Sequence, residues 1–188
     1  MFFEHVAVGF SMILSFGVVR LLDGLRPALV PGRRYWVHAV WLVQKLVNYA
    51  FYWWGFLSFR EDIAWTVASF LWILIAPSLL FLQATALVTT NPSAVNSWRA
   101  HFFGIRSWFF SVDAALILHS VLTASLLRGL PLLHPFHGLQ AVGLTISILG
   151  VASASPRLHA TLAPVALAFQ SLGLGWFFFR PQGLAVSP

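Results

Sequence analysis

Six long apolar runs fill most of this chain, and they constrain its fold more than any other feature. A helix needs about 20 mostly apolar residues to cross the hydrocarbon core of a bilayer. The segments between the runs are short and carry proline, glycine and arginine, which are typical of turns. We therefore predict an all-α polytopic membrane protein, a single transmembrane domain over residues 1–188, with six spans preferred within a range of five to seven. The predicted spans are residues 4–24, 35–58, 63–89, 106–127, 136–153 and 158–179.

The composition excludes an ordinary soluble protein. Of the 188 residues, 59% are apolar and 9% are charged, whereas soluble domains carry about a quarter charged residues. The net charge of +6 does not indicate nucleic-acid binding, because the arginines lie mostly in short loops and leave no basic face for a phosphate backbone. The partner that the composition predicts is the lipid bilayer. The chain has no cysteine, which excludes disulfides and thiolate metal sites.

Arginine is distributed unequally between the two sets of loops. Cytoplasmic loops are enriched in arginine and lysine, so the odd-numbered loops are predicted to be cytoplasmic, with both termini on the other side. The excess of arginine over lysine favours a GC-rich bacterial genome, and we predict a bacterial inner (plasma) membrane protein. The odd loops hold Arg20, Arg26, Arg33, Arg34, Arg99, Arg106 and Arg157, and the even loops with the C-terminal tail hold Arg60, Arg128 and Arg180, together with Glu61 and Asp62.

Lys45 is the only lysine in the chain, and it lies in the middle of the second apolar run. A charge near the centre of a bilayer costs at least a few kcal/mol, so such a residue faces the interior of a bundle or a water-filled cavity. Lys45 belongs to a stripe of residues that follow one another at spacings of three and four, and this spacing places them on one helix face. Gln44 flanks the stripe. The stripe either lines a polar pathway or only holds neighbouring helices together through hydrogen bonds. It consists of His38, Trp41, Lys45, Asn48 and Tyr52.

Asp113, in the fourth run, is the predicted partner of Lys45. Both runs begin at the same predicted face of the membrane. At 1.5 Å per residue, Lys45 lies about 15 Å and Asp113 about 10 Å along its helix, so the two side chains can meet. We predict that they form an intramembrane ion pair. Arg106, nearly two turns before Asp113, is the rival partner for the carboxylate.

The seven histidines are candidates for cofactor ligands. Haem b is held between histidines at matching depth on two helices, and His38 with His159 would form one such layer. His119 is the one histidine well inside a run, whereas most others lie at run ends, where imidazole suits the interface. The preferred prediction is therefore no cofactor, with haem b as the alternative. No spacing typical of a metal site or of a catalytic serine favours an enzyme.

Aromatic clusters in the second and third runs resemble those of a known group of proteins. The clusters are Tyr35-Trp36-Val37-His38, Tyr52-Trp53-Trp54 and Ser69-Phe70-Leu71, the last of which leads to Pro77. Over roughly its first four runs, the chain resembles small bacterial polytopic membrane proteins that have a tryptophan-rich second span and no assigned function. The resemblance implies a polytopic helical fold and no particular activity.

Three functions fit these patterns. The first is a small channel or transporter, whose basic centre favours an anion or a proton-coupled solute; if water solvates Lys45 there, Lys45→Met should leave the fold nearly intact. The second is a non-catalytic subunit of a larger membrane complex, with other membrane subunits or a homo-oligomer as partners. The third is a b-type haem redox protein. The residues predicted to form the pathway or polar cluster are Lys45, Asp113, Gln44, Asn48, His38, Tyr52 and His119.

Overall fold

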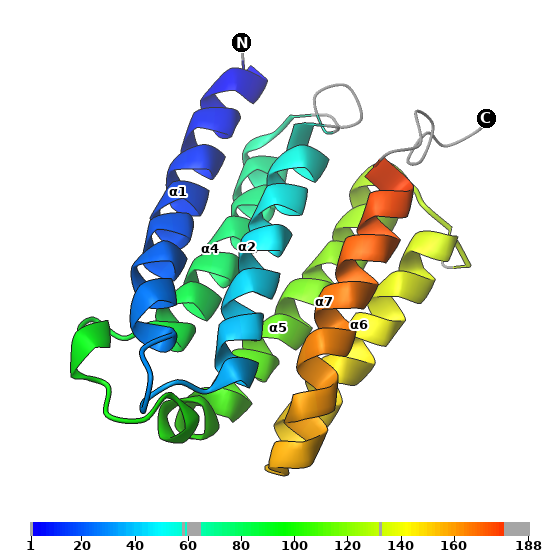
Figure 1. Cartoon of the computed structure of the whole chain (residues 1–188). Coiled ribbons are helices and arrows are strands. Elements are labelled where there is room, and N and C mark those ends of the chain that lie inside the picture. The colour runs from blue at the N-terminus through cyan, green and yellow to red at the C-terminus, as the bar shows by residue number, and fades with distance from the viewer. Residues whose placement is uncertain (1, 58, 60–64, 132, 179–188) are drawn as a thin grey trace.

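The computed structural model describes residues 2–57, 59, 65–131 and 133–178, and these form an all-α bundle (Figure 1). The prediction of an all-α fold is confirmed. Six long helices correspond to the six predicted spans, and one short 3-10 turn, η1, lies between the third and fourth of them. The elements are α1 (Phe2–Ala28), α2 (Trp36–Leu57), α4 (Val67–Leu87), η1 (Pro92–Ala94), α5 (Trp98–Arg128), α6 (Pro135–Ala152) and α7 (Pro156–Phe178).

The six long helices pack as a closed ring. Going round it, α1 contacts α4, α4 contacts α5, α5 contacts α6, α6 contacts α7, α7 contacts α2, and α2 returns to α1. Helix α2 also contacts α4 and α5 across the ring, so its polar face meets the interior. Helices α2, α5 and α7 all begin at the end of the bundle that is at the bottom of Figure 1, and the N-terminus lies at the opposite end. The order of packing therefore brings polar residues of distant runs to one centre.

The fourth predicted span begins too late in the sequence. Helix α5 runs without a break from Trp98, because the Ser97 side chain accepts a hydrogen bond from the backbone N–H of Ala100 (3.2 Å) and caps it there. It ends at Arg128, and the following Gly129 caps it with a φ of 65°, the left-handed conformation that glycine adopts easily. The first turns of α5 precede the predicted span 106–127, yet they are part of the bundle and carry buried Trp98 and Phe102.

The remaining boundaries are close to the predicted ones. Helix α4 begins where Thr66 and Ser69 form a reciprocal capping box. The residues predicted to end the second and sixth spans and to begin the third lie outside the described part of the chain. The same is true of four residues used for the orientation, Arg60, Glu61, Asp62 and Arg180.

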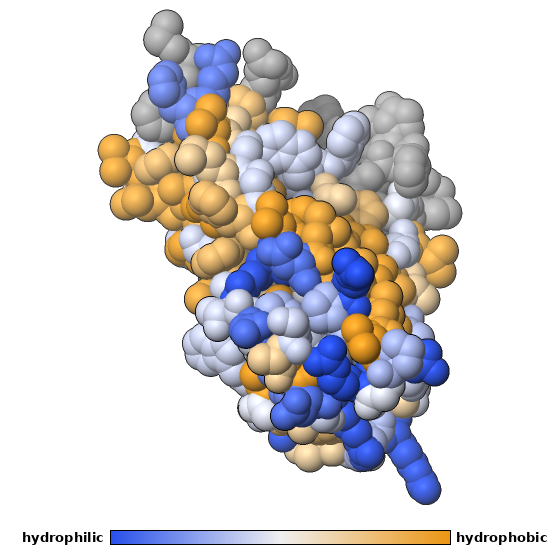
Figure 2. Space-filling view, turned by 60° about the vertical axis from the view of Figure 1, so that its left-hand side comes forward, coloured by the Kyte–Doolittle hydropathy of each residue, from blue (hydrophilic) through white to orange (hydrophobic). Residues whose placement is uncertain are grey.

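The surface of the bundle is largely apolar. One face of α1 exposes large apolar side chains at spacings of three and four, and Figure 2 shows apolar residues above a lower end where hydrophilic residues gather. Four helical segments are long and apolar enough to cross a membrane, namely Phe3–Ala28, Val67–Ala94, Trp98–Arg128 and Pro135–Ala152. These features indicate a membrane protein. The exposed residues of the α1 face are Val8, Met12, Phe16, Val19 and Leu22.

Candidate functional site

Lys45 and Asp113 form an ion pair inside the bundle. Lys45 Nζ donates to Asp113 Oδ1, and the side chains are 1% and 10% exposed. Two neutral donors complete the contacts of the carboxylate: Gln83 Nε2 donates to Oδ1 (2.7 Å) and Ser147 Oγ donates to Oδ2 (2.8 Å). The predicted contact is confirmed. One carboxylate thus binds side chains from α2, α4 and α6, and each of these groups exchanges its water for a partner.

Arg106, the rival partner for Asp113, has a different role. Its Nη1 donates to the backbone oxygens of Gly150 (3.0 Å), Val151 (2.6 Å) and Ser153 (2.8 Å) at the end of α6. The last carbonyls of a helix lack partners within the helix and carry its negative dipole end, so a guanidinium is favourable there. Arg106 therefore joins α5 to the end of α6.

A cavity of about 220 Å³ lies between the helices, in the half of the bundle nearer the N-terminus. It is lined on one side by Asp113 and reaches Arg128, at the end of α5. Most of the lining is apolar, and the polar groups form a band on α2, α5, α6 and α7. The polar lining residues are Gln44, Asn48, Tyr52, Asp113, His119, Ser120, Thr123, Arg128, Gln140 and Gln170.

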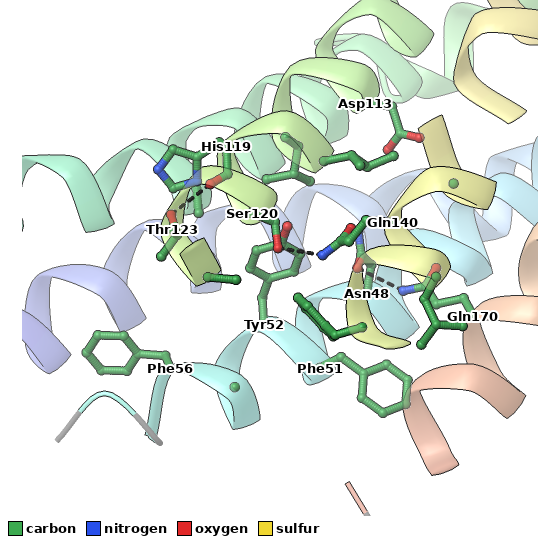
Figure 3. Close-up of a pocket in the computed structure, with 18 of the residues that line it drawn as sticks. Asn48, Phe51, Tyr52, Phe56, Asp113, His119, Ser120, Thr123, Gln140 and Gln170 are labelled. Atoms are coloured by element: carbon green, nitrogen blue, oxygen red, sulfur yellow. Dashed lines mark hydrogen bonds between the residues drawn. The ribbon is translucent and has the colours of Figure 1, made fainter. Parts of the chain in front are cut away.

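Three amides join α2 to α7 beside this cavity. Gln44 Nε2 donates to Gln170 Oε1, and Gln170 Nε2 donates to Asn48 Oδ1 (2.8 Å). Across the cavity, Gln140 Nε2 donates to Ser120 Oγ (2.7 Å), and the Tyr52 hydroxyl contacts the same serine. Figure 3 shows Ser120, Gln140, Asn48 and Gln170 close together, with the Tyr52 ring beside Ser120.

His119 lies on the α4 side of the cavity. Its Nε2 is 2.9 Å from the backbone oxygen of Trp72, and its ring stacks on the Trp72 indole at 4.9 Å. The indole N–H of Trp72 donates to Thr123 Oγ1 (2.9 Å), and Thr123 donates in turn to the His119 backbone oxygen (2.7 Å). His119 is thus held by α4 and does not join the amides of Asn48 and Gln170.

An aromatic layer lies between the cavity and the arginine-rich end of the bundle. The His38 ring stacks on Trp98 at 4.7 Å, and the His159 ring meets Phe102 edge-on at 5.2 Å and stacks on Phe110 at 5.6 Å. The indole N–H of Trp98 also donates to the backbone oxygen of Pro27 in the last turn of α1 (2.9 Å). We use the name aromatic layer for Tyr35, His38, Trp98, Phe102, Phe103, Phe110 and His159.

Comparison of the chain with protein-family models, curated proteins and solved structures finds no match. The geometry of the site is therefore the basis for a function.

Two of the predicted site residues lie away from the cavity. His38 belongs to the aromatic layer, because it lies seven residues before Lys45 on α2, which is about 10 Å along the helix axis. Lys45 is buried at 1% exposure, pairs with Asp113 and is not among the residues that line the cavity. The condition for Lys45→Met to leave the fold nearly intact was a lysine that faces a water-filled cavity, and this lysine faces Asp113 instead. The other five predicted site residues line the cavity, namely Gln44, Asn48, Tyr52, Asp113 and His119.

Sequence reasoning missed several residues that line the cavity or bind the Asp113 carboxylate. Each of the third, fifth and sixth apolar runs contains one glutamine, and an amide within a transmembrane run needs a partner inside the protein. That pattern was a usable signal. The serines and the threonine had no such signal, because their hydroxyls can bond to the backbone of their own helix. The missed residues are Gln83, Gln140, Gln170, Ser120, Thr123 and Ser147.

The histidine contacts give no support to the haem alternative. The rings of His38 and His159 both pack against Phe102, at 6.3 Å and 5.2 Å. His159 Nε2 is also 2.8 Å from the backbone oxygen of Ser153. A haem ligated by this pair would displace these aromatic contacts. Among the described residues, no group of three or more histidine or carboxylate side chains is placed to hold a metal ion.

Proposed function

We propose that this chain is a small membrane transporter that binds its solute in the central cavity and is not a permanently open channel. The observation that supports this most is the position of the cavity: it extends from the end of α5 to Asp113 in the middle of the bundle. Beyond it, the aromatic layer packs the space towards the arginine-rich end. A cavity with one closed end is the arrangement expected of a carrier in one of its two states.

Helix α7 marks the route that a solute would follow. Ala166 lines the cavity and His159 belongs to the aromatic layer. Ala163 lies between them on the same helix face, at spacings of three and four, and it is fully buried. Transport requires the layer to separate, and water would then reach Ala163.

Thiol reactivity tests the proposal, because the chain contains no cysteine of its own. A thiol reacts as the thiolate, which forms in water and not in lipid. We therefore expect Ile117→Cys, in the cavity lining, to react with methyl methanethiosulfonate in proteoliposomes. Leu118→Cys is the matched control, since it is the next residue of α5 and is 49% exposed on the apolar surface. Ala163→Cys should react more slowly than Ile117→Cys but faster than the control.

The outcomes separate the parts of the proposal. If Ile117→Cys reacts no faster than Leu118→Cys, water does not enter the cavity and the whole proposal fails. If Ile117→Cys reacts and Ala163→Cys does not, the aromatic layer never opens, and the cavity is a binding pocket without a transport pathway. The function as a subunit of a larger membrane complex stays a prediction.

A further inference from the structure

The inner end of the cavity carries no net charge. Asp113 is the acidic residue of the lining, and Lys45 neutralises it in a direct ion pair. Arg128 lies at the other end, where its guanidinium is 5.5 Å from the Phe59 ring. A charged group carried to the inner end would lose its water without meeting an opposite net charge, which is costly. The neutral pair therefore disfavours the anionic solute that the isolated lysine suggested.

The polar band has unused capacity for hydrogen bonds. Each primary amide has two N–H donors and two lone pairs on its oxygen. Gln140 donates one hydrogen bond to Ser120, and Gln170 donates one to Asn48, whose oxygen accepts it. Gln170 Oε1 also accepts from Gln44. Because these amides line the cavity, the donors and acceptors that no side chain uses are available to a molecule that binds there. Such a band recognises an amide, a hydroxyl or a carbonyl group.

The rest of the cavity lining consists of aromatic and aliphatic side chains. Binding sites with apolar walls and a few placed polar groups take ligands that are themselves mostly apolar, because burial of apolar surface supplies the affinity and the polar groups fix the orientation. A highly hydrated solute would lose its water against these rings without replacement. The aromatic residues of the lining are Phe10, Trp41, Phe51, Tyr52, Phe56, Phe59, Phe136 and Phe169.

We infer that the cavity takes an uncharged amphipathic molecule, with one amide, hydroxyl or carbonyl head that bonds to the polar band and an apolar body that lies against the aromatic walls. This inference rests on the proposed function, because it names the ligand class of the same cavity. The head lies near Asn48 and Gln140, and the body points towards the end of the bundle at which α5 ends.

Protection of Ile117→Cys from methyl methanethiosulfonate tests the ligand class. The probes share one apolar body and differ only in the head: 3-phenylpropanamide, 3-phenylpropanoate, 3-phenylpropylammonium and propylbenzene. We expect the amide to protect the thiol at a concentration about tenfold lower than any of the others, which corresponds to about 1.4 kcal/mol. Asn48→Leu and Gln140→Leu should abolish this preference for the amide. Thr145→Val, which removes an exposed hydroxyl of α6, is the matched control and should retain it.

The failure of this inference is distinguishable from the failure of the proposed function. Reaction of Ile117→Cys without any probe establishes that the cavity is open to water. Equal or stronger protection by either charged probe would then overturn the ligand class, while leaving the cavity in place. Equal protection by propylbenzene would also overturn it, because the polar band would then contribute nothing. Preference for the amide that survives both leucine variants would place the head elsewhere and contradict the assignment.

Discussion

At the scale of single residues, Asp113 is the centre of the molecule. Its two oxygens accept hydrogen bonds from Lys45, Gln83 and Ser147, and the Lys45 ammonium also lies 5.3 Å from the centre of the Phe109 ring. A buried ion pair contributes little net stability, because both charges lose their water. Removal of one partner is different, since it strands the other charge in a medium of low dielectric constant.

We therefore expect Lys45→Met alone to destabilise the protein by about 3–5 kcal/mol, and Asp113→Asn alone to destabilise it as well. The double variant should be more stable than Lys45→Met, because no charge remains unpaired. Unfolding of the three variants in one detergent, followed by tryptophan fluorescence, measures this coupling. Effects that simply add in the double variant would contradict a direct ion pair.

At the scale of helices, close approach depends on individual glycines. A Cβ atom at Gly17 of α1 would lie 1.9 Å from the Tyr49 hydroxyl of α2, and one at Gly150 of α6 would lie 2.5 Å from the Phe110 ring of α5. Small residues let transmembrane helices pack closely, which matters because lipid supplies no hydrophobic force between them. The ring of helices therefore depends on the absence of these side chains.

Two of the three glycines of α1 give a matched test. Gly17→Ala should destabilise the protein by about 1–3 kcal/mol, because Tyr49 or the helix itself has to move. Gly9→Ala, two turns earlier in the same helix, meets nothing within 4 Å and should be neutral or slightly stabilising, since alanine favours helix more than glycine does. Midpoints of thermal unfolding in detergent measure both changes. Equal effects at the two positions would show that α1 does not pack on α2 as described.

At the scale of the whole molecule, the two ends of the bundle differ. The end with the aromatic layer carries exposed arginines, whereas the cavity lies in the other half of the bundle. By the excess of positive charge, the closed end is predicted to face the cytoplasm and the cavity the opposite side. The exposed arginines at the closed end are Arg26, Arg34, Arg99 and Arg157.

Single cysteines in the loops test this orientation. Ala94→Cys lies in η1 at the arginine-rich end, and Leu133→Cys replaces a residue that is 98% exposed in the loop between α5 and α6. In spheroplasts of a bacterial host, a charged, membrane-impermeant thiol reagent added outside should modify Leu133→Cys at once and Ala94→Cys only after lysis. The reverse pattern would show that the cavity faces the cytoplasm.

The number and type of the long elements were readable from the sequence alone. In a bilayer every backbone hydrogen bond has to be made within the protein, so a long apolar run has little choice but to form a helix. The depth of a residue within the membrane was also readable from the sequence, because each helical residue adds 1.5 Å along the axis. This rise placed Lys45 and Asp113 at similar depths, and the structure joins them. The capping of α5 by Ser97 was missed, because apolarity marks the part of a helix that is in lipid and not the turns that precede it.

Only the tertiary structure decided which faces meet. The sequence showed that Lys45 must turn inwards, but not that Gln83 of α4 and Ser147 of α6 would share its carboxylate partner. It showed a polar stripe on α2, but the ring packing assigned His38 to the aromatic layer and Asn48 to the cavity. The physical reason is that apolarity fixes how deep each residue lies, whereas the choice of neighbours depends on side-chain shape and close approach at contacts such as Gly17 with Tyr49.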